Sequence, residues 1–378
     1  MSARRALVVL AAAIALGGGI VALGPGNVAT AMCPRNVDCD PGDPTPTPRP
    51  GPNATPLALV MCRPSDVAAP AGSITRWRNI FMPGGADPSN VVSYWHDVSN
   101  GRYDAGGSAT FGWLDIGHTT TEINRLTGQG QRVQLANWGR AAAASAGIDL
   151  SRFRQVVIGY NINADHGSVG GNTALIAYAE GRALEPTFIQ HEFGHALGLR
   201  DSASTEGGIY GNSFDIMSAM LVRAFSDTAG RGAGPGASAV TLENLGWLPA
   251  SRVVAVRAPF RPLLTTQITL AALNRPDLAD PLAVKVDGAP TIYIEYREPT
   301  GWDRGLSGPV VLVHRRSTTG NTYDSAEIFG NGWTPVGALS PGDTFNVPHL
   351  RTSPPVTVKF VRANTATSQA KIQVLTGS

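Results

Sequence analysis

The sequence has little charge, almost no lysine and few cysteines. Charged residues make up only 15% of the 378 residues, the formal net charge is +2, and lysine occurs only at Lys285, Lys359 and Lys371. No run of basic residues offers the positive surface that nucleic acid or an anionic membrane needs, so neither is expected as a partner. Hydrophobic residues, at 43%, are plentiful enough for a compact globular chain.

Three cysteines, Cys33, Cys39 and Cys62, are too few for a zinc knuckle without a fourth ligand. In an oxidising compartment the simplest outcome is one disulfide with one thiol left over. We therefore expect Cys62 to pair with Cys33 or Cys39, and any metal chemistry has to come from other residue types.

The N-terminus has the three parts of an export signal. Arg4 and Arg5 precede an apolar run over residues 6–23, and Ala29-Thr30-Ala31 forms a small-residue cleavage site. This pattern predicts a signal peptide over residues 1–31 and a secreted protein. The apolar run is also close to the length of a membrane span, so an uncleaved anchor at the cell surface is the alternative. The three glycines at 17–19 and the cleavage site favour removal.

Composition divides the remainder into three parts. Residues 32–72 are rich in Pro, Asp, Thr and Gly as far as Pro56 and predict a linker or short propeptide, with ordered structure starting near Ser73. Residues 73–250 mix helical and strand patterns. Residues 251–378 alternate short Val-, Ile- and Thr-rich segments with turn residues, which is typical of a β-sandwich. The expected fold class is α+β, with a twisted sheet backed by helices followed by an all-β domain.

The pattern within the middle part predicts strands over 108–116, 155–160 and 173–178 and a helix over 132–146. A further helix has clear boundaries. Pro186 suits its first turn, and Gly198 suits the left-handed position just past its end.

That bounded helix contains His191, Glu192 and His195. Residues four apart on a helix are separated by about 40° around its axis, so both imidazoles project from one face and can bind a single ion. Ile189 and Phe193 fall on the opposite, apolar face. The remaining histidines, at 96, 118, 166, 314 and 349, have no ligand spacing and are expected to be ordinary surface or core residues.

Zinc is the ion that this pattern favours, because imidazole suits it and three protein ligands leave a position for water. The bound water would have its pKa lowered to about 7. Glu192 follows the first ligand directly and is placed to act as the general base.

The third ligand is expected to be Asp201. Gly198 lets the chain turn sharply after the helix, and Asp201, three residues later, can reach back to the metal with a carboxylate oxygen. The alternative is that Asp201 forms a cap or a local ion pair while Glu206 or Asp215 completes the coordination.

The stretch from His191 to Asp201 resembles the extended zinc motif of the metzincin metallopeptidases. Residues 214–218, Phe-Asp-Ile-Met-Ser, are similar to the Met-turn of that group, which implies that Met217 lies in a hydrophobic floor under the metal. Without the resemblance, Met217 is an ordinary core residue. Both interpretations bury it.

The resemblance covers roughly residues 75–350. Residues 94–101, 244–247 and 293–297 are similar to the gametolysin and immune inhibitor A groups of secreted peptidases. Many metzincins have His as the third ligand, whereas this chain has Asp201, as snapalysin-like enzymes do. The resemblance implies a metzincin-like catalytic domain over 73–250, with a β-sandwich over 251–378.

Weaker signals surround the motif. Tyr210 lies shortly before the Met-turn and either donates its hydroxyl to the tetrahedral intermediate, as a tyrosine in that region does in some metzincins, or packs at the surface. The substrate is expected to lie along an edge strand, either 173–178 or the loop before it. Cys62 could act as a propeptide latch on the zinc instead of forming a disulfide. The loop 161–165 could hold calcium.

The sequence thus predicts a secreted, monomeric zinc endopeptidase that acts on proteins or peptides. One rival is a secreted binding or adhesion protein with a structural zinc, against which an intact Glu192 argues because such a site needs no base. A second rival is a zinc amidase acting on cell-wall substrates.

Overall fold

The computed structural model describes residues 54–70, 73–179, 184–206, 208–288, 290–317, 325–331, 334–348 and 353–378. All of these belong to one compact unit. The expected signal peptide, Cys33, Cys39 and His349 lie outside the described residues. Within the described part of the chain, every helix is too short or too polar to cross a bilayer.

The N-terminal half is built on a five-stranded sheet with the order β2-β1-β3-β5-β4. Its strands are β1 (Leu57–Arg63), β2 (Ala109–Asp115), β3 (Gln155–Tyr160), β4 (Gly167–Gly170) and β5 (Thr173–Ala177). The expected strands at 108–116, 155–160 and 173–178 are confirmed as β2, β3 and β5. All neighbours are parallel except β4 and β5, and β4 is an edge strand.

The prediction that ordered structure starts near Ser73 is wrong. Strand β1 lies inside the presumed linker and pairs in parallel with both β2 and β3. Its continuous apolar run, Leu57 to Cys62, is fully buried on both faces, as is usual for an interior strand of a parallel sheet.

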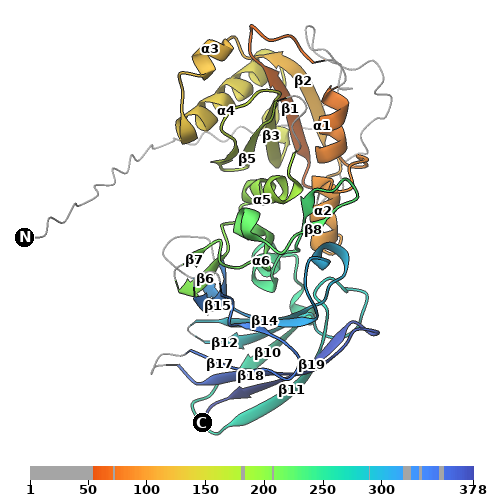
Figure 1. The fold of residues 1–378 in the computed structure, drawn as a ribbon, viewed down its shortest axis with the longest axis vertical. Coiled ribbons are helices and arrows are strands. Elements are labelled where there is room, and N and C mark those ends of the chain that lie inside the picture. The colour runs from red at the N-terminus through yellow and green to blue at the C-terminus, as the bar shows by residue number, and fades with distance from the viewer. Residues whose placement is uncertain are drawn as a thin grey trace, which may run out of the picture. The chain divides into compact units, whose positions relative to one another are not determined.

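Helices cover both faces of this sheet (Figure 1). One face packs on α4 (Gly128–Ser145), the helix expected over 132–146. The other packs on α1 (Ser73–Phe81), α2 (Val91–Val98) and α5 (Pro186–Ala196). Shorter helical segments are α3 (Thr120–Ile123), η1 (Leu150–Arg152), η2 (Ile216–Leu221), α6 (Ala239–Asn244), η3 (Ala250–Arg252) and η4 (Gly301–Asp303), and β8 (Phe225–Ser226) pairs with β9 (Gly232–Ala233).

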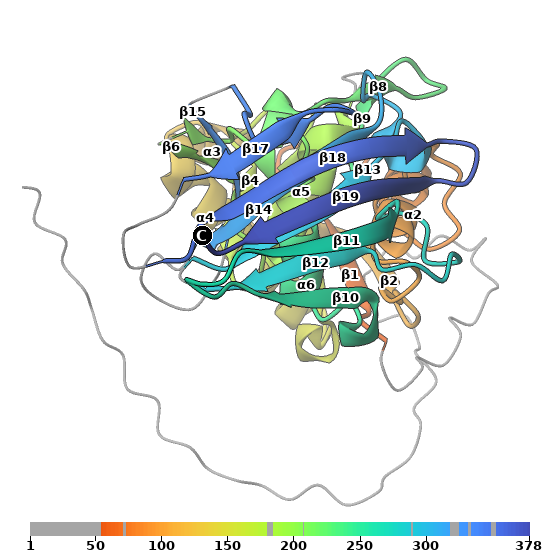
Figure 2. The same cartoon turned by 90° about the horizontal axis from the view of Figure 1, so that it is seen from below.

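The C-terminal half is a sandwich of two sheets that share one apolar core (Figure 2). The larger sheet contains β10 (Val253–Arg257), β12 (Ala283–Asp287), β13 (Ile292–Arg297), β14 (Val310–Ser317), β15 (Ser325–Asn331) and β16 (Ala338–Leu339). The smaller sheet has the order β11 (Leu264–Ala271), β19 (Gln369–Thr376), β18 (Val356–Asn364) and β17 (Thr344–Val347). The protein is therefore a mixed α/β chain of the α+β class.

The expected boundary at residue 250 does not separate two independent cores. Strands β6 (Ala203–Glu206) and β7 (Gly208–Ile209) come from the N-terminal half, yet they complete the larger sandwich sheet, in which β6 pairs in parallel with β15. In addition, Tyr293 and Ala283 of the sandwich belong to the same apolar cluster as Phe193 of α5. The two halves therefore share structure next to α5, the helix that carries His191 and His195.

Candidate metal centre

Helix α5 has the boundaries that its sequence predicts. Pro186 is in its first turn, the helix ends at Ala196, and Gly198 has a φ of +94°, which a residue without a Cβ adopts at little cost. Ile189 and Phe193 are each 1% exposed and anchor the apolar face. The opposite face is thereby turned towards the loop that follows the helix.

Three ligand atoms converge at the end of α5. The Nε2 atoms of His191 and His195 are 3.0 Å apart, and Asp201 Oδ1 lies 3.4 Å from the first and 3.2 Å from the second. Ligands bound about 2.05 Å from a tetrahedral zinc are separated by about 3.3 Å, so this set fits that ion. Asp201 Oδ1 is buried and forms no hydrogen bond of acceptable geometry, as expected of an atom reserved for a cation.

Backbone carbonyls orient both imidazoles. His191 Nδ1 lies 3.1 Å from the carbonyl oxygen of Ile216, and His195 Nδ1 lies 2.8 Å from that of Leu199. In the tautomer that frees both Nε2 lone pairs for a metal, each Nδ1–H donates to its carbonyl. In the other tautomer of His191, Nδ1 accepts the backbone N–H of Ala219, whose nitrogen lies 3.1 Å away. The ligand geometry is thus determined by segments beyond the helix itself.

The ionisation of His195 and that of Asp201 depend on each other. Burial opposes the charged form of His195, but its contacts with the Asp201 carboxylate and the Leu199 carbonyl raise the net pKa of the imidazole. Burial also opposes ionisation of Asp201, yet the two imidazoles outweigh it and hold the pKa of this carboxyl well below its usual range. A cation therefore meets an ionised carboxylate and has to compete with a proton on His195, so its binding weakens at low pH.

Glu192 lies beside the ligands and is held by the edge strand. Its side chain is 8% exposed, and its Oε2 accepts a hydrogen bond from the backbone N–H of Ser168 in β4. Gly167 leaves space for the Arg132 guanidinium and for this carboxylate, because a Cβ there would lie 2.6 Å from Arg132 Nη1 and 3.1 Å from Glu192 Oε1. The carboxylate is therefore positioned by both α5 and β4.

Met217 is fully buried beneath α5, as both interpretations of the sequence expected. Its sulfur fills the space above Gly194, where an added Cβ would lie only 2.4 Å from Sδ. Asp215 begins the η2 segment and accepts hydrogen bonds from the N–H groups of Met217 and Ser238. The alternative of Asp215 as a metal ligand is therefore wrong, and Glu206 in β6 is not part of the converging set either.

Tyr210 lies next to the ligands, with its ring edge-on to His191 and the centroids 6.1 Å apart. The residue has a φ of +62° and is only partly exposed. Partial burial and the charges of Asp201 and Glu192 raise the pKa of its hydroxyl, so it stays a protonated donor. Tyr210 thus lies beside the candidate metal ligands, where its hydroxyl can act as a hydrogen-bond donor.

Two expectations about Cys62 are wrong. The thiol is not in a disulfide, and it is fully buried in the core between the sheet and α4, away from the metal ligands. The latch on the zinc is excluded for the same reason. Burial raises the pKa of this thiol to about 12, so it is an inert core group.

The substrate was expected along an edge strand, either 173–178 or the loop before it. Strand β5 (173–177) is interior, and the edge is β4, formed by the loop that precedes β5.

The loop 161–165, expected as a calcium site, has one carboxylate, Asp165. It forms an ion pair with Arg132, at 3.1 Å between Asp165 Oδ2 and Arg132 Nε. Nothing in that loop favours calcium, and within the described residues the only group of three metal-ligating side chains is His191, His195 and Asp201.

Sequence reasoning missed a buried group of charged side chains in the sandwich. Glu295, Arg297 and Asp303 are each at most 2% exposed, and His314, expected to be ordinary, is fully buried beside them with Asn212 Nδ2 3.0 Å from its Nε2. The available signal was a Glu and an Arg two residues apart in an otherwise apolar strand.

No protein family, no curated protein and no solved structure matches this chain.

Proposed function

We propose that the protein is a secreted, zinc-dependent endopeptidase of the metzincin type. The observation that carries the proposal is the convergence of His191 Nε2, His195 Nε2 and Asp201 Oδ1 beside a carboxylate that is not part of the ligand set. Three protein ligands leave a coordination position open, which separates catalytic from structural zinc sites. The export signal over residues 1–31 supports secretion.

Each residue has a defined task in this proposal. His191, His195 and Asp201 would hold the ion, which would supply Lewis-acid chemistry for activating water and polarising the scissile carbonyl. Glu192 would act as the general base and then as the proton donor to the leaving amine, and the Ser168 N–H keeps its carboxylate in place. Tyr210 donates a hydrogen bond to the developing oxyanion. Met217 and Gly194 provide the packed floor.

The test combines metal analysis with a protease assay. We expect the purified protein to contain one zinc per chain, to cleave denatured casein, to lose activity with a chelator and to regain it with zinc. Glu192→Gln should retain the zinc and lower turnover by at least about 10²-fold, the usual contribution of a general base. Unchanged turnover in this variant would refute the assigned base.

The assay also separates the rivals. Hydrolysis of peptidoglycan but not of casein would indicate the amidase. A stably bound zinc with neither activity would indicate a binding protein. Neither outcome is compatible with the proposed endopeptidase.

A further inference from the structure

The segment from Gly236 to Ala239, which leads into α6, is held by buried charged side chains. Three of its backbone N–H groups donate to carboxylates, and one of its carbonyls accepts from a guanidinium. Gly236 N–H donates to Asp303 Oδ1 (3.0 Å), and Ala237 O accepts from Arg297 Nη1 (3.0 Å). Ser238 N–H donates to Asp215 Oδ2 (2.8 Å), and Ala239 N–H donates to Glu295 Oε2. Three of these four side chains, those of Glu295, Arg297 and Asp303, come from the sandwich half of the chain.

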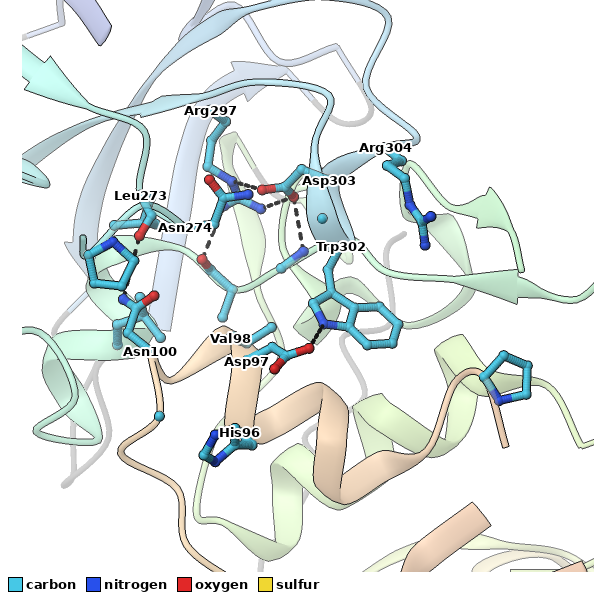
Figure 3. Close-up of a pocket in the computed structure, with 17 residues that line it drawn as sticks. His96, Asp97, Val98, Asn100, Leu273, Asn274, Arg297, Trp302, Asp303 and Arg304 are labelled. Atoms are coloured by element: carbon cyan, nitrogen blue, oxygen red, sulfur yellow. Dashed lines mark hydrogen bonds and ion pairs between the residues drawn. The ribbon is translucent and has the colours of Figure 1, made fainter. Parts of the chain in front are cut away.

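Arg297 binds two of these carboxylates, and Figure 3 shows its pairing with Asp303. Its Nε donates to Asp303 Oδ2 at 2.7 Å, its Nη2 donates to Asp303 Oδ1, and its Nη1 also donates to Glu295 Oε1 at 3.1 Å. The Arg297–Asp303 pair forms one wall of a pocket of about 560 Å³ that contains none of the metal ligands. Burying ions is costly, so a pair used only for stability could be replaced by apolar residues at little loss.

The segment connects this arrangement to a metal ligand. Gly236 O accepts a hydrogen bond from Ile216 N–H at 3.3 Å, and Ile216 O is the carbonyl that lies 3.1 Å from His191 Nδ1. Asp215, which holds Ser238, also accepts the N–H of Met217 at 2.8 Å. The Gly236–Ala239 segment thus positions the backbone of Ile216, whose carbonyl orients His191. Arg297 and Asp303 hold that segment through their hydrogen bonds to Ala237 and Gly236.

We infer that Arg297 and Asp303 are positioning residues for the metal centre, and that the sandwich is an integral part of that centre rather than an appended binding module. They act through Gly236, Ala237 and Ile216 on the orientation of His191. A second link supports the inference, because Asp201 lies two residues before β6, which pairs with β15 of the sandwich. The inference rests on the proposed metal site but not on the proposed hydrolysis.

The test compares Asp303→Asn and Arg297→Lys with a matched exposed pair. Arg275 and Asp277 form the same kind of ion pair in the sandwich half, with side chains 39% and 59% exposed, so Arg275→Lys and Asp277→Asn are the controls. Zinc affinity by chelator competition, the visible spectrum of the cobalt-substituted protein, and kcat and KM are measured on protein shown to be folded by circular dichroism.

We expect Asp303→Asn and Arg297→Lys to bind zinc about 10- to 100-fold more weakly, as loss of support for a ligand usually does, to change the cobalt spectrum, and to lower kcat more than they raise KM. The control variants should match the wild type. Should the charge variants not fold, Gly236→Ala is the milder probe, since its Cβ would lie 3.1 Å from Arg297 Nη2 and leaves every charge in place.

Folded variants with wild-type zinc affinity and an unchanged cobalt spectrum would overturn the inference, whether or not the protein hydrolyses peptides. Failure of the proposed function looks different. In that case the wild type binds zinc and cleaves no substrate, while the affinity and spectral differences between the variants persist.

Discussion

Asp201 is the proposed third ligand, and its position depends most on tertiary structure, because it lies beyond the end of α5. Asp201→Ala should weaken zinc binding by at least about 100-fold, since the two imidazoles alone cannot complete a stable site. The variant should still fold, because a zinc-free centre loses only the contacts of Asp201 with the two imidazoles. Chelator competition measures the effect, with the exposed Asp149→Asn as the control. Wild-type affinity in Asp201→Ala would assign the third ligand elsewhere.

Cys62 provides a second test at the scale of one residue. Because its thiol is fully buried and its pKa is raised to about 12, iodoacetamide at pH 8 should leave it unmodified in the native protein and label it after denaturation. Peptide mapping by mass spectrometry distinguishes it from Cys33 and Cys39. Rapid labelling of the native protein would contradict the buried position in β1.

Packing between α5 and η2 can be tested at the scale of elements. In Gly194→Ala the new Cβ would lie 2.4 Å from Met217 Sδ and 3.0 Å from the Trp95 ring, so the thioether must move. Overpacking of this kind costs about 1–3 kcal/mol of the free energy of unfolding. We also expect weaker zinc binding, because Met217 and the His191-orienting carbonyl of Ile216 are adjacent in η2.

The matched control is Gly130→Ala in α4, where an added Cβ meets no atom within 4 Å. This substitution should stabilise the protein by about 0.5–1 kcal/mol, because alanine loses less conformational entropy than glycine in a helix. Urea denaturation compares the two variants. If both substitutions changed the free energy of unfolding by the same amount, the effect at Gly194 would come from helix propensity and not from the contact with Met217.

At the scale of the whole molecule, the buried Glu295 makes the free energy of unfolding depend on pH. Burial raises the pKa of Glu295 from 4.5 to about 7, although Arg297 opposes the shift. The folded state therefore holds this proton more tightly than the unfolded state does. The stabilisation is complete below about pH 4.5 and is lost as the pH rises through 7, by at most about 3 kcal/mol.

Urea denaturation of the zinc-free protein between pH 4.5 and 8 measures this loss without the pH dependence of metal binding. Glu295→Gln, which cannot ionise, should make the free energy of unfolding change less over that range. If the free energy of unfolding changed equally with pH in the wild type and in Glu295→Gln, Glu295 would be ionised over the whole range.

Local patterns predicted helix α5 because its determinants lie within about a dozen residues of one another. The i, i+4 spacing of His191 and His195, Pro186 and Gly198 act through the geometry of one helix. Strand β1 was missed for a related reason. Its short apolar run follows a Pro-rich stretch, and its pairing partners in β2 and β3 are about 50 and 100 residues away in the sequence, so no local period identifies it.

By itself the sequence determined the face of α5 that carries the imidazoles, the position of Glu192 on that face and the turn at Gly198. Tertiary structure alone decided that Asp201 meets the imidazoles, that Asp215 binds backbone N–H groups, and that Arg297 binds the backbone of Ala237. The physical reason is range. Helical geometry is set by neighbours along the chain, whereas β6 pairs with β15 about 125 residues later only when both halves have packed on their common core.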